Sequence, residues 1–205
     1  MKKTVIAVLV SGSGTNLQSI IDNCESGSLP AVVACVVSDR EGAFGLERAK
    51  RHGIPSFFID PGTHSPREAH EEAIAEILDR YRVEVVVLAG YMRLLTERMI
   101  DRYRNRIINI HPALLPSFPG TDGYGDAWRY GVKVSGCTVH FVDEGCDTGP
   151  IILQRANPIE ENDTFESFRE RGLKIEHQVL PEALRLFCEG RLRIEGRRVK
   201  ILGKE

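Results

Sequence analysis

The segment Thr4-Val5-Ile6-Ala7-Val8-Leu9-Val10 runs directly into Ser11-Gly12-Ser13-Gly14-Thr15-Asn16 near the start of the chain. Seven apolar or β-branched residues in a row indicate a strand that is covered on both faces. After the glycine-rich turn, Leu17, Ile20 and Ile21 recur at helical spacing. Strand, tight turn and helix in this order predict the first part of a βαβ unit, and hence an α/β domain with parallel strands.

Strand-like and helix-like segments alternate further along the chain. We expect strands at 31–37, 55–59, 83–89 and 107–110, and helices at 16–24, 45–52, 67–81 and 97–103. Helix 67–81 should turn its alanine, isoleucine and leucine residues inward and its glutamates outward. The later part predicts extended segments at 134–143 and 149–156, a helix at 164–189 and a hairpin at 191–202. The whole predicts one domain over residues 1–205, with a mostly parallel, Rossmann-like sheet flanked by helices and an antiparallel extension in its C-terminal part.

The composition is that of an ordinary globular domain of 205 residues, with 42% hydrophobic residues and a net charge of −2. This balance argues against nucleic-acid and membrane partners, and no apolar run approaches the ~18 residues of a membrane span. The five cysteines are scattered without metal-ligand spacing. We therefore expect free thiols, no metal site and a reducing, cytoplasmic location.

The glycine-rich turn is a candidate phosphate site. Backbone N–H groups at the start of a helix attract an anion, and the glycines let it approach closely. The turn lacks the third glycine of a dinucleotide site and the Gly-Lys-Ser/Thr of a nucleoside triphosphate loop. A single phosphate monoester therefore fits best, although a purely structural turn with an ordinary helix cap at Thr15-Asn16 remains open.

Asn109 and His111 close the strand expected at 107–110 and point to the same face of the sheet. An amide beside an imidazole suits a reaction that builds negative charge on a carbonyl oxygen. Asp143, Glu144 and Asp147 lie in a later acidic loop, and a carboxylate within ~4–6 Å of an imidazole raises its pKa. A structural histidine and a solvent-facing acidic turn are the alternatives for these two motifs.

Four motifs together resemble the folate-dependent formyltransferases, and among them the phosphoribosylglycinamide formyltransferases of purine synthesis. They are S-G-S-G-T-N-L-Q at 11–18, A-G-Y-M-R-L-L at 89–95, N-I-H-P-A-L-L-P-S-F-P-G at 109–120 and T-V-H-F-V-D-E-G-C-D-T-G-P-I-I at 138–152. The resemblance runs in order over about residues 4–190. One segment departs from it, because many members carry a histidine where Thr121–Asp126 stands here.

The resemblance implies roles for particular residues. Asn109 would bind the formyl oxygen, His111 would be the catalytic acid, and Asp147 would raise the pKa of His111. The phosphate of the acceptor would be held by Gly14, Thr15, Asn16 and Leu17, and its glycinamide end by Glu176. Formyl-folate would be bound by Arg67, Met92, Arg93, Leu94 and Leu95, in addition to Asn109. A cis peptide bond at Leu115-Pro116 is expected on the same ground.

The implied reaction transfers the formyl group of 10-formyltetrahydrofolate, a co-substrate, to the amine of glycinamide ribonucleotide. The expected partners are these small molecules, and the sequence leaves a monomer or a homodimer open. The rivals are a formyl-folate hydrolase, which normally has an additional domain before the catalytic one, and a methionyl-tRNA formyltransferase, which has one after it. A non-catalytic phosphate-binding module is the rival from another class.

Overall fold

The glycine-rich turn connects a buried strand to a helix, as the sequence predicts. In the computed structural model, which describes residues 2–203, β1 (Thr4–Val10) leads into α1 (Thr15–Glu25). The next elements are β2 (Ala31–Ser38), α2 (Phe44–Arg51), β3 (Ser56–Phe58), α3 (Arg67–Arg80), β4 (Val85–Leu88), α4 (Glu97–Arg102) and β5 (Ile107–His111). They are followed by α5 (Gly123–Tyr130), β6 (Val134–Phe141), β7 (Ile151–Pro158), α6 (Phe165–Cys188), β8 (Leu192–Glu195) and β9 (Arg198–Ile201).

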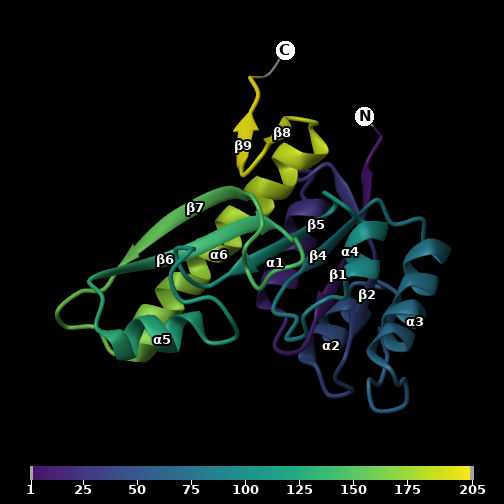
Figure 1. The fold of residues 1–205 in the computed structure, drawn as a ribbon, viewed down its shortest axis with the longest axis horizontal. Coiled ribbons are helices and arrows are strands. Elements are labelled where there is room, and N and C mark those ends of the chain that lie inside the picture. Colours follow the sequence, from purple (N-terminus) through teal and green to yellow (C-terminus); the bar gives the residue numbers. More distant parts are fainter. Residues whose placement is uncertain (1, 204–205) are drawn as a thin grey trace.

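The strands form one sheet in the order β3-β2-β1-β4-β5-β6-β7-β9-β8 (Figure 1). The first five strands in sequence pair in parallel, and β6 and β7 then add to β5 as antiparallel neighbours. The predicted fold class, including the antiparallel extension, is therefore confirmed. The chain moves outward from β1 in one direction and returns to start β4 on its other side. Ligands of open α/β sheets bind at such a switch point, beyond the carboxyl ends of the strands.

Helices cover both faces of the sheet because successive residues of β1 point to opposite sides. Ile6, Val8 and Val10 pack with α1, α2 and α6, whereas Ala7 and Leu9 pack with α3 and α4. The helices thus pack against both faces of the central strands. The long α6 crosses behind β6 and β7 (Figure 1). The loops at the carboxyl ends of β1, β4 and β5 thus have a firm base.

Two details differ from the sequence-based expectation. Gly123–Tyr130 forms α5, a helix that is not among those expected from the sequence. Asp122 caps it by accepting a hydrogen bond from the Gly125 N–H at 3.2 Å. The glycines at 123 and 125 are weak helix formers and conceal the helix in the sequence. Glu71 on α3 is buried, not outward, because it accepts a hydrogen bond of 2.8 Å from the Thr96 N–H at the start of α4.

The terminal hairpin of β8 and β9 forms as predicted, and the Leu115-Pro116 peptide bond is cis, as predicted. The five cysteines carry no disulfide. Among residues 2–203, no helix is long and apolar enough to cross a membrane.

Candidate active site

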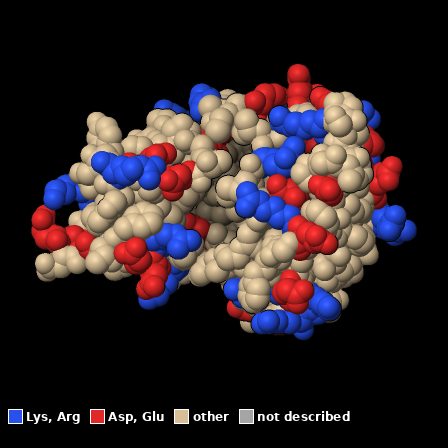
Figure 2. Space-filling model, turned by 90° about the horizontal axis from the view of Figure 1, so that it is seen from below, with Lys and Arg blue, Asp and Glu red and all other residues tan. Residues whose placement is uncertain are grey.

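A cleft of about 430 Å³ lies at the carboxyl ends of β1, β4 and β5. Its walls include the glycine-rich turn at 12–16, the segment Met92–Leu95, the pair Asn109 and His111, the loop ending at Asp147, and Glu176 on α6. The space-filling view shows the hollow between the two sides of the molecule, with charged side chains of both signs around it (Figure 2). Met92 and Asn109, which the resemblance assigns to one folate site, both line this cleft.

His111 and Asp147 are in contact, although 35 residues separate them in sequence. His111 Nδ1 lies 3.3 Å from Asp147 Oδ2, and the histidine side chain is 2% exposed. The Nε2 atom of the same ring lies 2.6 Å from the carbonyl oxygen of Phe118. Both ring nitrogens therefore face oxygen acceptors, and only the doubly protonated ring can donate to both.

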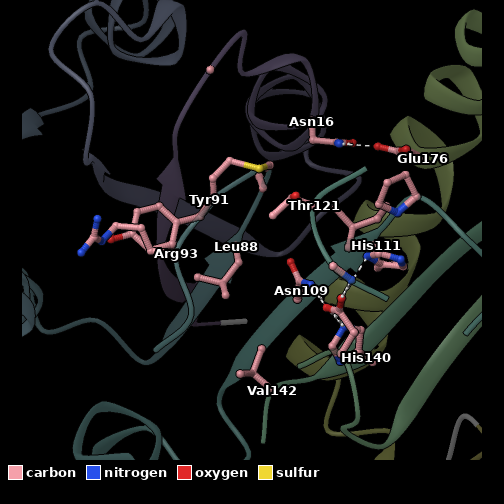
Figure 3. A pocket seen from close by; sticks show the side chains of 18 of the residues that line it. Asn16, Leu88, Tyr91, Arg93, Asn109, His111, Thr121, His140, Val142 and Glu176 are labelled. Atoms are coloured by element: carbon pink, nitrogen blue, oxygen red, sulfur yellow. Dashed lines mark hydrogen bonds and ion pairs between the residues drawn. The ribbon is translucent and has the colours of Figure 1, made fainter. Parts of the chain in front are cut away.

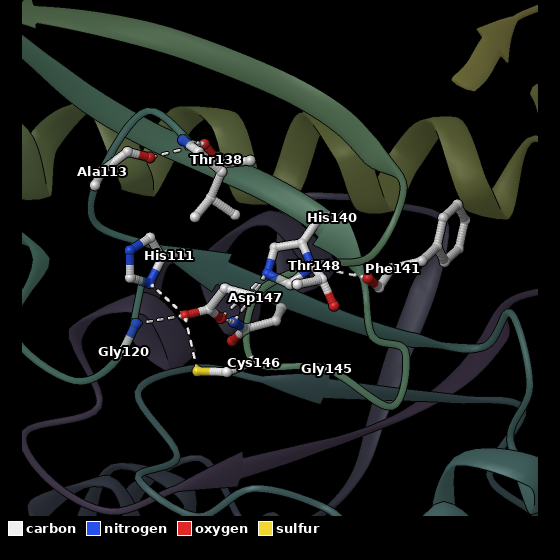
Figure 4. Close-up of polar contacts among 12 residues, drawn as sticks. His111, Ala113, Gly120, Thr138, His140, Phe141, Gly145, Cys146, Asp147 and Thr148 are labelled. Atoms are coloured by element: carbon white, nitrogen blue, oxygen red, sulfur yellow. Dashed lines mark hydrogen bonds and ion pairs between the residues drawn. The ribbon is translucent and has the colours of Figure 1, made fainter. Parts of the chain in front are cut away.

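Asp147 is surrounded by hydrogen-bond donors (Figure 4). Its Oδ2 accepts from the Gly120 N–H at 2.8 Å, and its Oδ1 accepts from Asn109 Nδ2 at 3.3 Å. Burial opposes ionisation, but the hydrogen bonds and the nearby charges of His140 and His111 prevail and lower the pKa of Asp147 to about 2. The carboxylate is thus ionised at neutral pH.

The pKa of His111 differs from the expected one. Burial has the largest effect and lowers the pKa of His111 below the ordinary histidine value, while Asp147 and the Phe118 carbonyl act in the opposite direction. The predicted influence of Asp147 is therefore present, but the predicted net rise is wrong in the free protein. A ring with a lowered pKa is a stronger acid once it is protonated.

His140 on β6 joins this group, and we did not single it out from the sequence. Its Nε2 lies 3.2 Å from Asn109 Nδ2 and 3.5 Å from Asp147 Oδ1. The amide nitrogen of Asn109 therefore reaches both His140 and Asp147, and its oxygen faces the cleft (Figure 3). To bind a substrate oxygen, the amide must exchange one of these long hydrogen bonds, which are weak at this distance.

The glycine-rich turn is tied to its surroundings through backbone contacts. Gly14 caps α1 with φ 67°, and no side chain caps this helix. A Cβ at Gly14 would lie 2.6 Å from Gly45 Cα, so the turn packs directly on the start of α2. Ser11 links the turn to the neighbouring loop, because its Oγ accepts from the Met92 N–H at 2.9 Å. Gly14, Thr15 and Asn16 line the cleft, whereas the Leu17 side chain lies in the core.

The segment Met92–Leu95 supplies an apolar wall. Leu94 is 58% exposed and Met92 is 44% exposed, although both line the cleft together with Arg93 and Leu95. Arg67 lies at the edge instead of inside, and its guanidinium donates a hydrogen bond to the Leu94 carbonyl. Large apolar side chains left open in a cleft are typical of a ligand site.

Glu176 lies beside Asn16 in the wall of the cleft (Figure 3). It is 4% exposed, and it accepts hydrogen bonds from Asn16 Nδ2 at 2.6 Å and from the Tyr124 hydroxyl. Burial is the largest influence and raises the pKa of Glu176, and the two hydrogen bonds oppose it. The expected set Asn109, His111, Asp147, Asn16 and Glu176 thus meets around one cavity.

Similarities to known proteins identify the family of this chain. The family model described as formyl transferase matches residues 4–184. The chain belongs to the formyl transferase family. A phosphoribosylglycinamide formyltransferase of Bacillus subtilis is 46% identical over 90% of this chain and 94% of its own length. A crystal structure of glycinamide ribonucleotide transformylase 1 from Symbiobacterium toebii is 55% identical with a TM-score of 0.96, over 98% of this chain and 95% of the other.

Longer proteins contain the same unit. A trifunctional purine biosynthetic protein of Chironomus tentans is 44% identical over 94% of this chain, and the chain spans 14% of that protein. This member of the formyl transferase family is therefore a transferase whose relatives occur both as separate chains and within multifunctional ones.

Two polar residues of this formyl transferase, His140 and Tyr124, were not singled out in the sequence. His140 carries a detectable signal, because it and Thr138 are polar residues two positions apart in a mostly apolar strand, a pattern that indicates buried polar contacts. Tyr124 lies in the segment that departs from the family pattern, and only the unrecognised helix α5 brings it to Glu176.

Proposed function

We propose that the chain transfers the formyl group of 10-formyltetrahydrofolate to the amino group of glycinamide ribonucleotide. The observation that carries this proposal is the contact between His111 and Asp147 in the same cleft as the glycine-rich turn. A candidate acid for acyl transfer and a candidate phosphate site line this cleft together, as a reaction between a formyl donor and a phosphorylated acceptor requires. The Bacillus subtilis relative is a phosphoribosylglycinamide formyltransferase, which supports this choice of acceptor and of transferred group.

The acceptor phosphate would lie against Gly12–Asn16, where the first N–H groups of α1 have no carbonyl partner within the helix. Glu176 and Asn16 would then meet the remainder of the acceptor, close to the turn. The Leu17 side chain is committed to the core, so this residue would contribute only its backbone N–H.

The folate would lie against the apolar wall formed by Met92, Leu94 and Leu95. The exposed area of Met92 and Leu94 supports this placement, because covering it with a flat ring system would remove apolar surface from water. Arg67 would act indirectly, through its hydrogen bond to the Leu94 carbonyl. Arg93 would contribute a contact to the folate at the rim of the cleft.

The chemistry needs no nucleophilic side chain. The neutral amine of the acceptor attacks the formyl carbon, and negative charge develops on the formyl oxygen. His111 Nε2–H would transfer its hydrogen bond from the Phe118 carbonyl to this oxygen, and Asn109 would exchange a hydrogen bond in the same way. The ionised Asp147 favours the protonated imidazole at this moment, and the amine loses a proton as the folate nitrogen leaves with one. Proximity of two bound substrates would supply most of the remaining acceleration.

One assay tests this function: formyl loss from 10-formyltetrahydrofolate, measured with and without glycinamide ribonucleotide. We expect folate release to require the acceptor and to match the formylated product in amount. Release of formate without the acceptor would identify a hydrolase instead. Phosphate-ester binding without turnover of any formyl donor would identify a binding module.

A further inference from the structure

The carboxyl group of Glu176 is held from two sides by residues of different helices. Asn16 on α1 donates to Oε2 at 2.6 Å, and the Tyr124 hydroxyl on α5 donates to Oε1. All three residues line the cleft and are at least nine-tenths buried. The position of this carboxyl group is therefore fixed before any ligand arrives.

Asn16 also presents an acceptor that is unsatisfied. Its Oδ1 is buried and has no hydrogen-bond partner. Buried polar atoms are nearly always paired, so an unpaired acceptor in the wall of a cleft indicates a missing donor. Together with the Glu176 oxygens, this buried atom makes the cleft wall rich in acceptors at this point, which suits O–H or N–H groups of a ligand.

Tyr124 fits this position through a matching gap on α6. Gly172 lies opposite, and a Cβ there would overlap the hydroxyl and the ring of Tyr124. The ring is also held edge-on against Phe168, with centroids 5.6 Å apart, and Trp128 stacks on the same phenylalanine. The tyrosine is thus positioned by packing, and its hydroxyl donates a hydrogen bond to Glu176.

We propose that Tyr124 is a positioning residue of the acceptor site, which holds Glu176 so that its oxygens and Asn16 Oδ1 together receive hydrogen-bond donors of the acceptor. The inference rests on the proposed function and extends it to a segment that departs from the common family pattern. Tyr124 acts only through Glu176 and plays no part in the chemical step at His111.

The groups that face Glu176 explain why the tyrosine matters. Asn16 on α1 is uncharged, Cys137 on β6 offers a neutral thiol, and Arg169 on α6 is the cation that acts on the carboxyl group. Burial favours the neutral acid here, and the Tyr124 hydrogen bond opposes that effect. Removing the hydroxyl would therefore move the ionisation of Glu176 to higher pH.

The test is Tyr124→Phe, which removes the hydroxyl and keeps the ring. We expect kcat/KM for glycinamide ribonucleotide to fall about 10- to 100-fold, the effect of losing a hydrogen bond to a charged group. We also expect the acid limb of its pH profile to move up by about one unit. The kcat at saturation and the KM for the folate should stay within about twofold of the wild type, because the chemical step lies elsewhere.

Trp128→Phe serves as the matched control, because it alters the same aromatic group without touching Glu176. It should lower the melting temperature and leave the acid limb in place. A second route is Gly172→Ala, which keeps the hydroxyl but displaces it, and it should reproduce the loss in kcat/KM. It also replaces the first test if Tyr124→Phe does not fold.

A double-mutant cycle with Glu176→Gln decides whether Tyr124 acts through the carboxyl group. In the Gln background, Tyr124→Phe should change kcat/KM by less than about twofold. A full, independent loss there, or an unmoved acid limb in Tyr124→Phe, overturns the proposal. If the wild-type protein does not formylate glycinamide ribonucleotide at all, it is the proposed function that fails.

Ribose 5-phosphate distinguishes the two kinds of donor, because it has the hydroxyls and the phosphate but no glycinamide group. If ribose hydroxyls bind this surface, its inhibition constant should rise in Tyr124→Phe in parallel with the KM for the acceptor. If the N–H groups of the glycinamide bind, only the KM should rise. The proposal fails if neither constant changes.

Discussion

Two carboxyl groups line the cleft, and their pKa values move in opposite directions. Asp147 is held by the Gly120 N–H and by Asn109 between two histidines, and its pKa falls to about 2. Glu176 has two neutral donors, and burial raises its pKa. Burial disfavours the charge at both positions. At Asp147 the hydrogen bonds and two nearby histidines outweigh burial, whereas at the more deeply buried Glu176 the two neutral donors and Arg169 do not.

The comparison separates two tasks. Asp147 keeps a negative charge at neutral pH beside the proposed acid, as a catalytic group requires. Glu176 is a carboxyl group whose charged form is disfavoured by burial, as a recognition site allows. Variants that alter one of the two carboxyl groups at a time test whether these two tasks are separate.

The largest effect is expected on turnover, at Asp147. Asp147→Asn keeps the shape but removes the charge that raises the pKa of His111, so the basic limb of turnover should move to lower pH. Loss of acid assistance should reduce kcat by roughly 10²–10⁴-fold, measured in steady-state assays across pH. Calorimetry should show that both substrates still bind.

His111→Ala sharpens the same prediction. Since the pair acts as a unit, the double variant should be scarcely slower than either single one. Near-normal turnover in Asp147→Asn with an unmoved pH profile would make Asp147 an ordinary loop acid.

The next largest effect is expected on acceptor affinity, at the glycine-rich turn, which contacts Glu176 through Asn16. A methyl group at Gly12 meets nothing within 4 Å, so Gly12→Ala should fold normally and obstruct the phosphate. Affinity for the acceptor should fall about 10-fold, the loss of a hydrogen bond or two at this site, while the affinity for a folate analogue stays unchanged. Isothermal calorimetry with each ligand measures both.

Gly14→Val is the contrasting variant. Gly14 has φ 67° and touches Gly45, so this substitution should lower the melting temperature and weaken both ligands together. Equal losses of both ligands in Gly12→Ala would show that the turn is structural only.

A smaller effect is expected at the apolar wall. Leu94→Ala removes part of a side chain that is exposed in the free protein, so the fold should not suffer. The KM for the folate should rise about 10-fold or less, as expected for a few methylene groups that are buried on binding, and the KM for the acceptor should not change. Val32→Ala, an exposed apolar residue on β2, is the control, and an equal effect there would exclude a specific role for Leu94.

The smallest effect is a change in stability with pH. The pKa of Glu176 is higher in the folded than in the unfolded protein, so its favourable contribution is complete below the unfolded value and is lost as pH rises through the folded one. Glu176→Gln should therefore match the wild type near pH 4 and melt a few degrees higher at pH 8, roughly 2–4 °C for each kcal/mol relieved. A lower melting temperature at pH 8 would contradict this account.

The sequence predicted the sheet well because buried strands read as continuous apolar runs, as in Val85–Leu88. It also predicted that His111 would meet Asp147, but only through the family resemblance, since no local pattern specifies a contact across 35 residues. It could not predict the sign of the His111 pKa shift, which depends on how completely the ring is buried. It did not reveal α5, because Gly123 and Gly125 are weak helix formers. These two positions need glycine because a Cβ there would collide with Pro112 and Asp122.

The close approach of Gly14 to Gly45 limits how this protein could be redesigned for another acceptor. The turn meets α2 through main-chain atoms of Gly14 and Gly45 and through the Arg48 side chain, which donates to the Ser13 carbonyl. A larger side chain at Gly14 or Gly45 would therefore displace the helix. The wall on α5 and α6 is formed by side chains, and of these positions Tyr124 and Gly172 must be varied together, because a Cβ at Gly172 would overlap the tyrosine. A library for new acceptors should therefore vary Tyr124, Arg169, Gly172 and Leu173 and leave residues 12–16 and 45 unchanged.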